Sequence, residues 1–145
     1  MRALLRSLLL LPCLALSACR GAGEPVAELT VTPASLELEL GSFVELGLRI
    51  VPLTDLEAGV APQVFLHLVD EPGSVLRTFD HRLPGEFRKG QEIAYRVRIH
   101  QSAVAEPLAP GRYTLTAGLH DGAGGRFPLQ GASVEVARLE YAVAT

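Results

Sequence analysis

Four histidines and a few neighbouring acidic side chains are the residues that could hold a metal ion or act as a general base. The histidines are His67, His81, His100 and His120. Two of them have an adjacent carboxylate, in the pairs Asp80 with His81 and His120 with Asp121. Neighbouring residues on a strand point to opposite faces, so neither pair forms a chelate by spacing alone. We expect no metal and no cofactor.

The sequence also offers little for nucleophilic or phosphate chemistry. No serine lies in a Gly-x-Ser-x-Gly pattern, the usual setting of a hydrolase nucleophile. Glu37 and Glu39 lie two apart, as on the solvated face of a strand. The glycine-rich stretch DGAGG at residues 121–125 lacks the lysine and the following helix of a phosphate-binding loop, and it favours a hairpin turn. We expect no enzymatic activity.

Both cysteines lie near the N-terminus, at Cys13 and Cys19. Residues 1–18 have the parts of a secretory signal peptide: Arg2 and Arg6, then an apolar core, then two small residues. The apolar run is about nine residues long, whereas a helix needs roughly 20 to cross a bilayer. A signal peptide is therefore favoured over a transmembrane helix.

Leu16, Ser17, Ala18 and Cys19 resemble the lipobox of bacterial lipoproteins. The resemblance implies cleavage between Ala18 and Cys19, a diacylglycerol on the cysteine sulfur and acylation of the new amino group. The expected product is exported and held on a membrane through its lipid. The arginine after Cys19 would, under the sorting rule of enteric bacteria, place it on the outer membrane facing the periplasm. The alternative is an ordinary secreted protein in which Cys19 is incidental.

The expected mature chain is acidic. The whole sequence has 13 basic and 16 acidic residues; removing Arg2 and Arg6 leaves 11 basic residues and a formal charge of −5. This balance opposes nucleic-acid binding through a basic patch. Residues 19–27, which follow the signal, contain glycine and proline without an apolar period and predict the lipidated cysteine and a short tether.

Residues 28–145 alternate between apolar and polar side chains. The alternation is clear in residues 36–40, 44–50, 93–99 and 113–119, and it predicts strands with one buried face. Residues 64–69 are apolar on both faces except at His67, as in a central strand. Seven to nine such strands, separated by turn residues, predict an all-β, antiparallel, two-sheet sandwich in one domain.

Leu108, Pro110, Gly111 and Tyr113 resemble the tyrosine corner of immunoglobulin and fibronectin type III folds. The resemblance implies that the Tyr113 hydroxyl bonds to backbone just upstream; the alternative is a core tyrosine after a turn. More widely, residues 64–129 are similar to the immunoglobulin-like accessory domains of exported bacterial proteins. That similarity implies a fold and leaves the ligand open.

A possible interaction strip is the feature on which we base a functional expectation. Phe87, Arg88 and Lys89 in a polar loop, with Arg96 and Arg98 on the strand that follows, predict a basic strip on an acidic domain. The alternative is a solvated sheet face without a partner. We expect a non-catalytic structural or protein-interaction module of the cell envelope, with an acidic protein partner. The alternatives are an envelope polysaccharide-binding module, although the chain has no tryptophan, and a protease inhibitor that presents a loop.

Overall fold

The structure is a computed structural model that describes residues 23–101, 104, 106–130 and 137–143. Within this part the chain forms strands and turns, with no helix. The strands are β1 (Ala27–Thr32), β2 (Ser35–Leu38), β3 (Phe43–Pro52), β4 (Gln63–Val69), β5 (Val75–Thr78), β6 (His81–Arg82), β7 (Ile93–His100), β8 (Gly111–His120), β9 (Leu129–Gln130) and β10 (Ala137–Val143). Two of these ten strands have only two residues, too few for alternation to reveal them.

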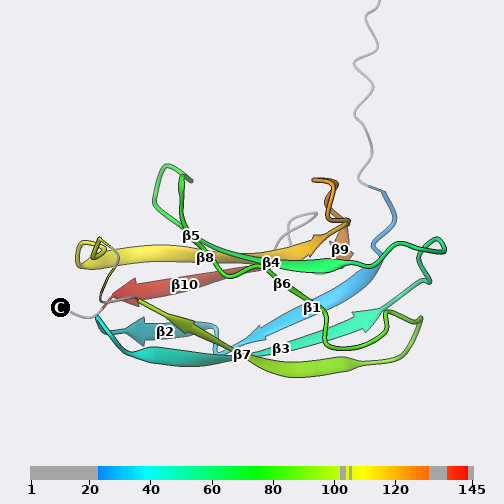
Figure 1. The fold of residues 1–145 in the computed structure, drawn as a ribbon, viewed down its shortest axis with the longest axis horizontal. Helices are drawn as coiled ribbons and strands as arrows, with labels where there is room; N and C mark the ends of the chain where they lie inside the picture. Colours follow the sequence, from blue (N-terminus) through cyan, green and yellow to red (C-terminus); the bar gives the residue numbers. More distant parts are fainter. Residues whose placement is uncertain (1–22, 102–103, 105, 131–136, 144–145) are drawn as a thin grey trace, which may run out of the picture.

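The strands form two sheets that lie face to face as a sandwich (Figure 1). The order in the first sheet is β7, β3, β1, β9; in the second it is β2, β10, β8, β4, β5, with β6 also paired to β4. We call the outward surfaces the β3 face and the β4 face. The all-β two-sheet sandwich expected from the sequence is confirmed.

The core lies between the sheets and comes from the inward residues of each alternating strand. Leu46, Leu48 and Ile50 project from β3, and Leu66 and Leu68 project from β4; all five are almost fully buried. Each buried leucine or isoleucine side chain contributes about 1.5–3 kcal/mol relative to an exposed one. This shared apolar interior is the main force that holds the two sheets together.

Two of the strand pairings are parallel, which the expected antiparallel sandwich did not include. β1 runs parallel to β9, and β2 runs parallel to β10. The remaining ladders are antiparallel. The periodicity of one strand shows which residues face inward but not which strand lies beside it, so the sequence could not predict these two edges.

The expected tyrosine corner is present. The Tyr113 hydroxyl donates a hydrogen bond to the Ala109 carbonyl oxygen at 2.6 Å, four residues upstream. The bond fastens the connection before β8 to the beginning of that strand. The hairpin expected at residues 121–125 is also confirmed. The Asp121 amide donates to the Gly125 carbonyl at 2.9 Å, and the backbones of His120 and Arg126 form an antiparallel β-bridge.

One side-chain pair joins the two sheets at their edge. The His81 Nδ1 lies 2.9 Å from the Phe79 carbonyl, which makes Nδ1 the protonated nitrogen. The Nε2 then accepts from the Tyr95 hydroxyl at 2.7 Å. Burial raises the pKa of Tyr95 above its usual value, so the hydroxyl remains a donor. The pair links β6 of one sheet to β7 of the other.

Replacing Tyr95 with phenylalanine removes this donor and leaves the His81 Nε2 lone pair unsatisfied. We expect the free energy of unfolding to fall by about 1 kcal/mol, the usual value of such a bond. A double-mutant cycle with His81→Ala, measured by urea denaturation, should give a coupling energy of similar size. A coupling energy near zero would show that the pair does not hold the sheets together.

Candidate interaction surface

The proposed lipidation and cleavage residues, Cys19 and Ala18, lie outside the described residues. Where the described chain begins, it is already attached to the sandwich. The Val26 amide donates to the Pro128 carbonyl at 2.9 Å, and the Val26 carbonyl accepts from the Leu53 amide at 2.8 Å. Ala27, placed in the tether by sequence, is the first residue of β1 and is fully buried. We call this the N-terminal end of the domain.

Arg96 and Arg98 project from β7 onto the β3 face, where they share one carboxylate. The Arg98 Nε donates to Glu45 Oε1 at 3.0 Å, and the Arg96 Nη1 lies 3.5 Å from Glu45 Oε2. The antiparallel register sets this pairing, because it places Arg98 directly opposite Glu45 and Arg96 opposite Gly47. The hydrogen bond from Arg98 lowers the pKa of Glu45, and the charges of both arginines act in the same direction.

A second ion pair continues the same row of charges. Arg49 on β3 donates from its Nε to Glu92 Oε2 at 2.8 Å. The row therefore sets three arginines against two glutamates, a net charge of +1. Sequence analysis missed Glu45 and Glu92 as partners of these arginines, since nothing local to β7 indicates which residues of β3 lie opposite. The face is a set of paired charges with a small positive excess.

The other three residues of the expected strip lie at the N-terminal end. The Lys89 amide donates to Asp55 Oδ1 at 2.8 Å, and the Gly90 amide donates to the Pro52 carbonyl at 2.9 Å. Arg88 pairs with Glu86. Pro52 and Glu45 are seven residues apart on β3, about 23 Å along the strand. The structure thus separates this loop from Arg98 by most of the length of the sheet.

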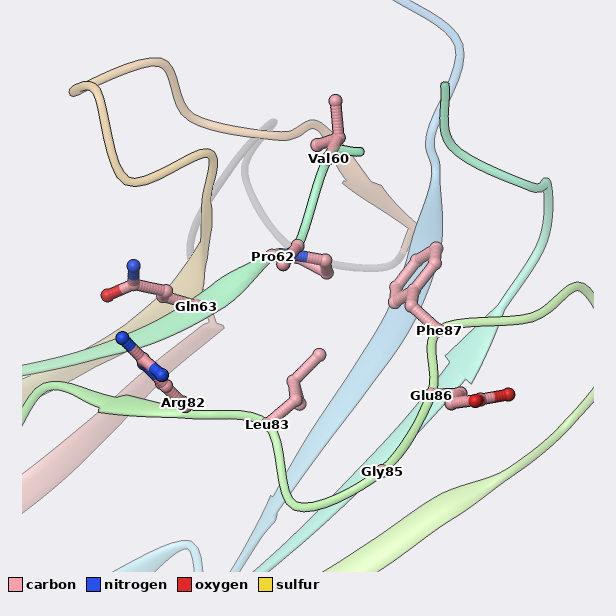
Figure 2. A pocket seen from close by; sticks show the side chains of 9 residues that line it. Val60, Pro62, Gln63, Arg82, Leu83, Gly85, Glu86 and Phe87 are labelled. Carbon is pink, nitrogen blue, oxygen red and sulfur yellow. The ribbon is translucent and has the colours of Figure 1, made fainter. Parts of the chain in front are cut away.

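Phe87 lines a pocket at that N-terminal end (Figure 2). The pocket has a volume of about 540 Å³ and combines apolar with polar side chains. Its apolar wall is formed by Val60, Pro62, Leu83 and Phe87, and its polar side chains include Gln63, Arg82 and Glu86. Leu83 and Phe87 also pack against the core. The Phe87 ring is therefore part of this pocket and is separate from the row of arginines.

Two large apolar side chains are exposed at the opposite end of the β3 face. Phe43, the first residue of β3, is 56% exposed, and Leu40 just before it is 53% exposed. The Arg98 guanidinium carbon lies 4.7 Å from the centre of the Phe43 ring, within cation–π distance. Because β1 begins opposite Pro52, this end of β3 is the one remote from the N-terminal segment. We call it the distal end.

The histidines lie mainly on the second sheet. The pairing of Asp80 differs from the one that adjacency in the sequence indicated. His67 Nε2 lies 3.0 Å from Asp80 Oδ1, which also accepts from the Leu66 amide at 3.0 Å. Asp80 therefore pairs across the sheet with His67, while its neighbour His81 bonds to Tyr95. Within the described ranges no group of three histidine, cysteine or acidic residues is placed to hold a metal ion. No helix in the same ranges is long and apolar enough to cross a membrane.

No protein-family model matches this chain, and no curated protein matches it by sequence. Solved structures resemble it in fold. The CARDB domain of a Pyrococcus furiosus protein, in complex with di-metal ions, has 11% identity and a TM-score of 0.49, over 82% of this chain and 93% of that one.

Two other similar structures are larger proteins. The alkylpurine DNA glycosylase AlkC of Pseudomonas fluorescens, bound to DNA containing an abasic site analog, has 15% identity and a TM-score of 0.49, over 83% of this chain and 31% of that one. The β-glucosidase of Listeria innocua has 17% identity and a TM-score of 0.49, over 84% and 16%. At these levels the likeness concerns the fold and does not extend to function.

Replacing Arg98 with glutamine removes the hydrogen bond that lowers the pKa of Glu45. We expect the pKa of Glu45 to rise toward its usual value, and NMR titration of the carboxyl group measures this change. A lowered pKa in the folded state gives stability that is present above the unfolded pKa and lost as the pH falls through the folded one. The variant should therefore lose less stability on acidification. Arg96→Gln, which removes the longer contact, is the control; an equal or larger shift there would contradict the assignment.

Proposed function

We propose that this chain is a non-catalytic module of the cell envelope, held on a membrane by lipid at Cys19, that binds a protein partner. The distal end of the β3 face is the proposed contact. The observation that carries the proposal is the exposed Phe43 ring with the Arg98 guanidinium above it. Exposed aromatic side chains and arginines contribute most of the binding energy in many protein interfaces.

The partner should combine an apolar pocket with carboxylates at its rim. Phe43 and Leu40 supply apolar surface that would be removed from water on binding. Arg96 and Arg98 share one glutamate, so this part of the face has an excess of one positive charge. Such a small excess favours acidic groups on the partner without requiring a strongly acidic protein. Of the basic strip expected from the sequence, the proposed contact therefore includes only Arg96 and Arg98.

A polysaccharide ligand is the second candidate, and the pocket beside Phe87 is what favours it. The pocket provides one aromatic ring together with amide, guanidinium and carboxylate groups, which suit a ligand rich in hydroxyls. It lies where the N-terminal segment joins the sandwich, at the end of the domain that a lipid on Cys19 would keep close to the membrane.

The anchor is tested by Cys19→Ser in the full-length chain. We expect the wild-type protein to sediment with membranes and the variant to appear in the soluble fraction, because the lipid can no longer be attached. Metabolic labelling with a radioactive or clickable fatty acid gives a second measurement, with label expected on the wild type alone. Label retained by the variant would rule out Cys19 as the lipid site.

The partner surface is tested by in-cell crosslinking of the full-length, tagged protein. Phe43→Ala should reduce the yield of the main crosslinked protein by about tenfold or more, since truncating a central aromatic commonly costs about 2 kcal/mol. Val75→Ala is the matched control, because Val75 is 51% exposed on the second sheet. Unchanged capture by Phe43→Ala would exclude this surface. Recovery of polysaccharide without a protein partner would favour the second candidate.

A further inference from the structure

β7 forms an open edge of the first sheet. Its eight residues stay in register with β3 without a break, from Ile93 opposite Ile50 to His100 opposite Phe43. Among the strands that the structure describes, β3 is the only one that pairs with β7. The last strand of a sheet has amide and carbonyl groups on its outer side that no other strand satisfies. This edge could therefore accept another strand.

The hydrogen bonds of the first sheet show which residues of β7 face the edge. The Leu53 amide donates to the Val26 carbonyl at 2.8 Å, one step beyond the pair Ala27 and Pro52 in the register of β1 and β3. Bonded and non-bonded pairs alternate in an antiparallel ladder. Odd-numbered residues of β3 therefore bond to β1, and even-numbered residues, which lie opposite odd-numbered residues of β7, bond to β7. The backbone groups left at the open edge are those of Ala94, Arg96, Arg98 and His100.

A hydrogen bond just beyond β7 agrees with this assignment. The Gln101 carbonyl accepts from the Gly41 amide at 3.0 Å, and Gly41 lies two residues before β3. The odd-numbered Gln101 thus directs its carbonyl toward the β3 side, as the alternation requires. Within the described ranges no loop forms a backbone hydrogen bond with Ala94, Arg96 or Arg98, and all three are exposed.

The side chains of β7 present two different surfaces to an added strand. Arg96 and Arg98 project onto the β3 face, and their side chains are 77% and 67% exposed. Tyr95 and Val97 point inward and pack against the core, yet both are only partly buried. A strand added at the edge would cover these two residues with its inward side chains and place its outward side chains beside the arginines. Its inward residues should therefore be apolar.

Charge decides which strand fits. Two copies of β7 paired antiparallel would bring the arginines of both copies together, and like charges opposite one another destabilise a sheet. A second copy of this chain is thus a poor occupant. Glu45 accepts from Arg98 at 3.0 Å but lies 3.5 Å from Arg96, and the two arginines keep one positive charge in excess. A strand with carboxylates on its outward side would compensate this charge.

We propose that the open edge of β7 binds an extended segment of the protein partner as an added strand, in which acidic residues alternate with apolar ones. The carboxylates lie beside the two arginines, and the apolar side chains cover Tyr95 and Val97. In this binding mode backbone hydrogen bonds provide affinity and alternate side chains provide specificity. The inference rests on the proposed protein partner and names the way in which it binds. The edge is continuous with the proposed contact, because His100 lies opposite Phe43.

Hydrogen exchange of the free, full-length protein in detergent tests whether the edge is open. We expect fast exchange at the amides of Ala94, Arg96 and Arg98, and protection at Tyr95 and Val97, whose amides bond to β3. NMR resolves these amides individually. Equal protection of the two sets would show that the edge is already covered and would overturn the proposal.

The probe for the added strand is an acetylated, amidated heptapeptide of alternating valine and glutamate. Titrated into the full-length protein in detergent, it should slow exchange at Ala94, Arg96 and Arg98 at least tenfold. The matched peptide with lysine in place of glutamate should bind at least tenfold more weakly, because its ammonium groups would meet the arginines. Equal binding of the lysine peptide, or no binding of the glutamate peptide up to its solubility limit, would contradict the proposal.

Two substitutions separate the backbone from the charge. Ala94→Pro removes an amide that faces the edge, where proline is tolerated, and should weaken binding of the glutamate peptide about tenfold. Ala94→Val keeps the amide and is the control. Arg96→Glu should reverse the preference, so that the lysine peptide binds more tightly than the glutamate peptide. Circular dichroism verifies that each variant is folded. Unchanged binding by folded Ala94→Pro, or an unchanged preference in Arg96→Glu, would exclude the edge as the binding site.

In-cell crosslinking of the full-length protein distinguishes this inference from the proposed function. Loss of the main crosslinked protein in both Ala94→Pro and Phe43→Ala would support both. Loss in Phe43→Ala alone would retain the partner surface and overturn the added strand. Loss in Ala94→Pro alone would support the added strand and exclude the Phe43 surface. Capture retained by both variants would overturn both.

Discussion

The apolar interior shared by the two sheets is the constraint from which the rest of this structure follows. Leu46 and Leu48 from one sheet and Leu66 and Leu68 from the other are buried together. Because side chains alternate along a strand, the residues on either side of each inward-pointing residue point to the outer face of the sheet. Taking an unpaired charge into the interior costs several kcal/mol, so the charged residues collect on the two outer faces. There the register of the strands decides which of them meet.

The same rule gives the two outer faces different chemistry. On the β3 face the register places Arg98 opposite Glu45, and the charges largely neutralise one another. On the β4 face Phe65 lies opposite Gly118, and the hairpin brings Arg126 over the ring; within the described residues no ion pair joins Arg126 to a carboxylate. Exposed ion pairs contribute little to stability, so the β3 row mainly orients its side chains.

How far the sequence predicts this molecule depends on whether a feature is local. Alternation in residues 44–50 and 93–99 predicted β3 and β7 and their buried faces. The resemblance to a tyrosine corner implied a hydrogen bond from Tyr113 to the backbone just upstream, and the acceptor is Ala109. Strand partners could not be predicted, because alternation is the same whichever strand lies alongside. That is why the parallel edges were missed, and why Asp80 was associated with His81 in the sequence but pairs with His67 in the structure. Sites whose residues come from different strands could therefore be located only from the structure.

The position of the N-terminal segment bears on which proposed ligand can be reached. With lipid on Cys19, the four residues to Gly23 extend at most about 14 Å, so the Phe87 pocket would lie close to the bilayer. Phe43 lies nine residues along β3 from Pro52, about 30 Å from the N-terminal end of the domain. A protein partner could approach the distal end without displacing the domain from the membrane, whereas a long polysaccharide would have to enter the narrow space beneath it. If lipid on Cys19 holds the domain in this way, the geometry favours the proposed protein partner over the polysaccharide.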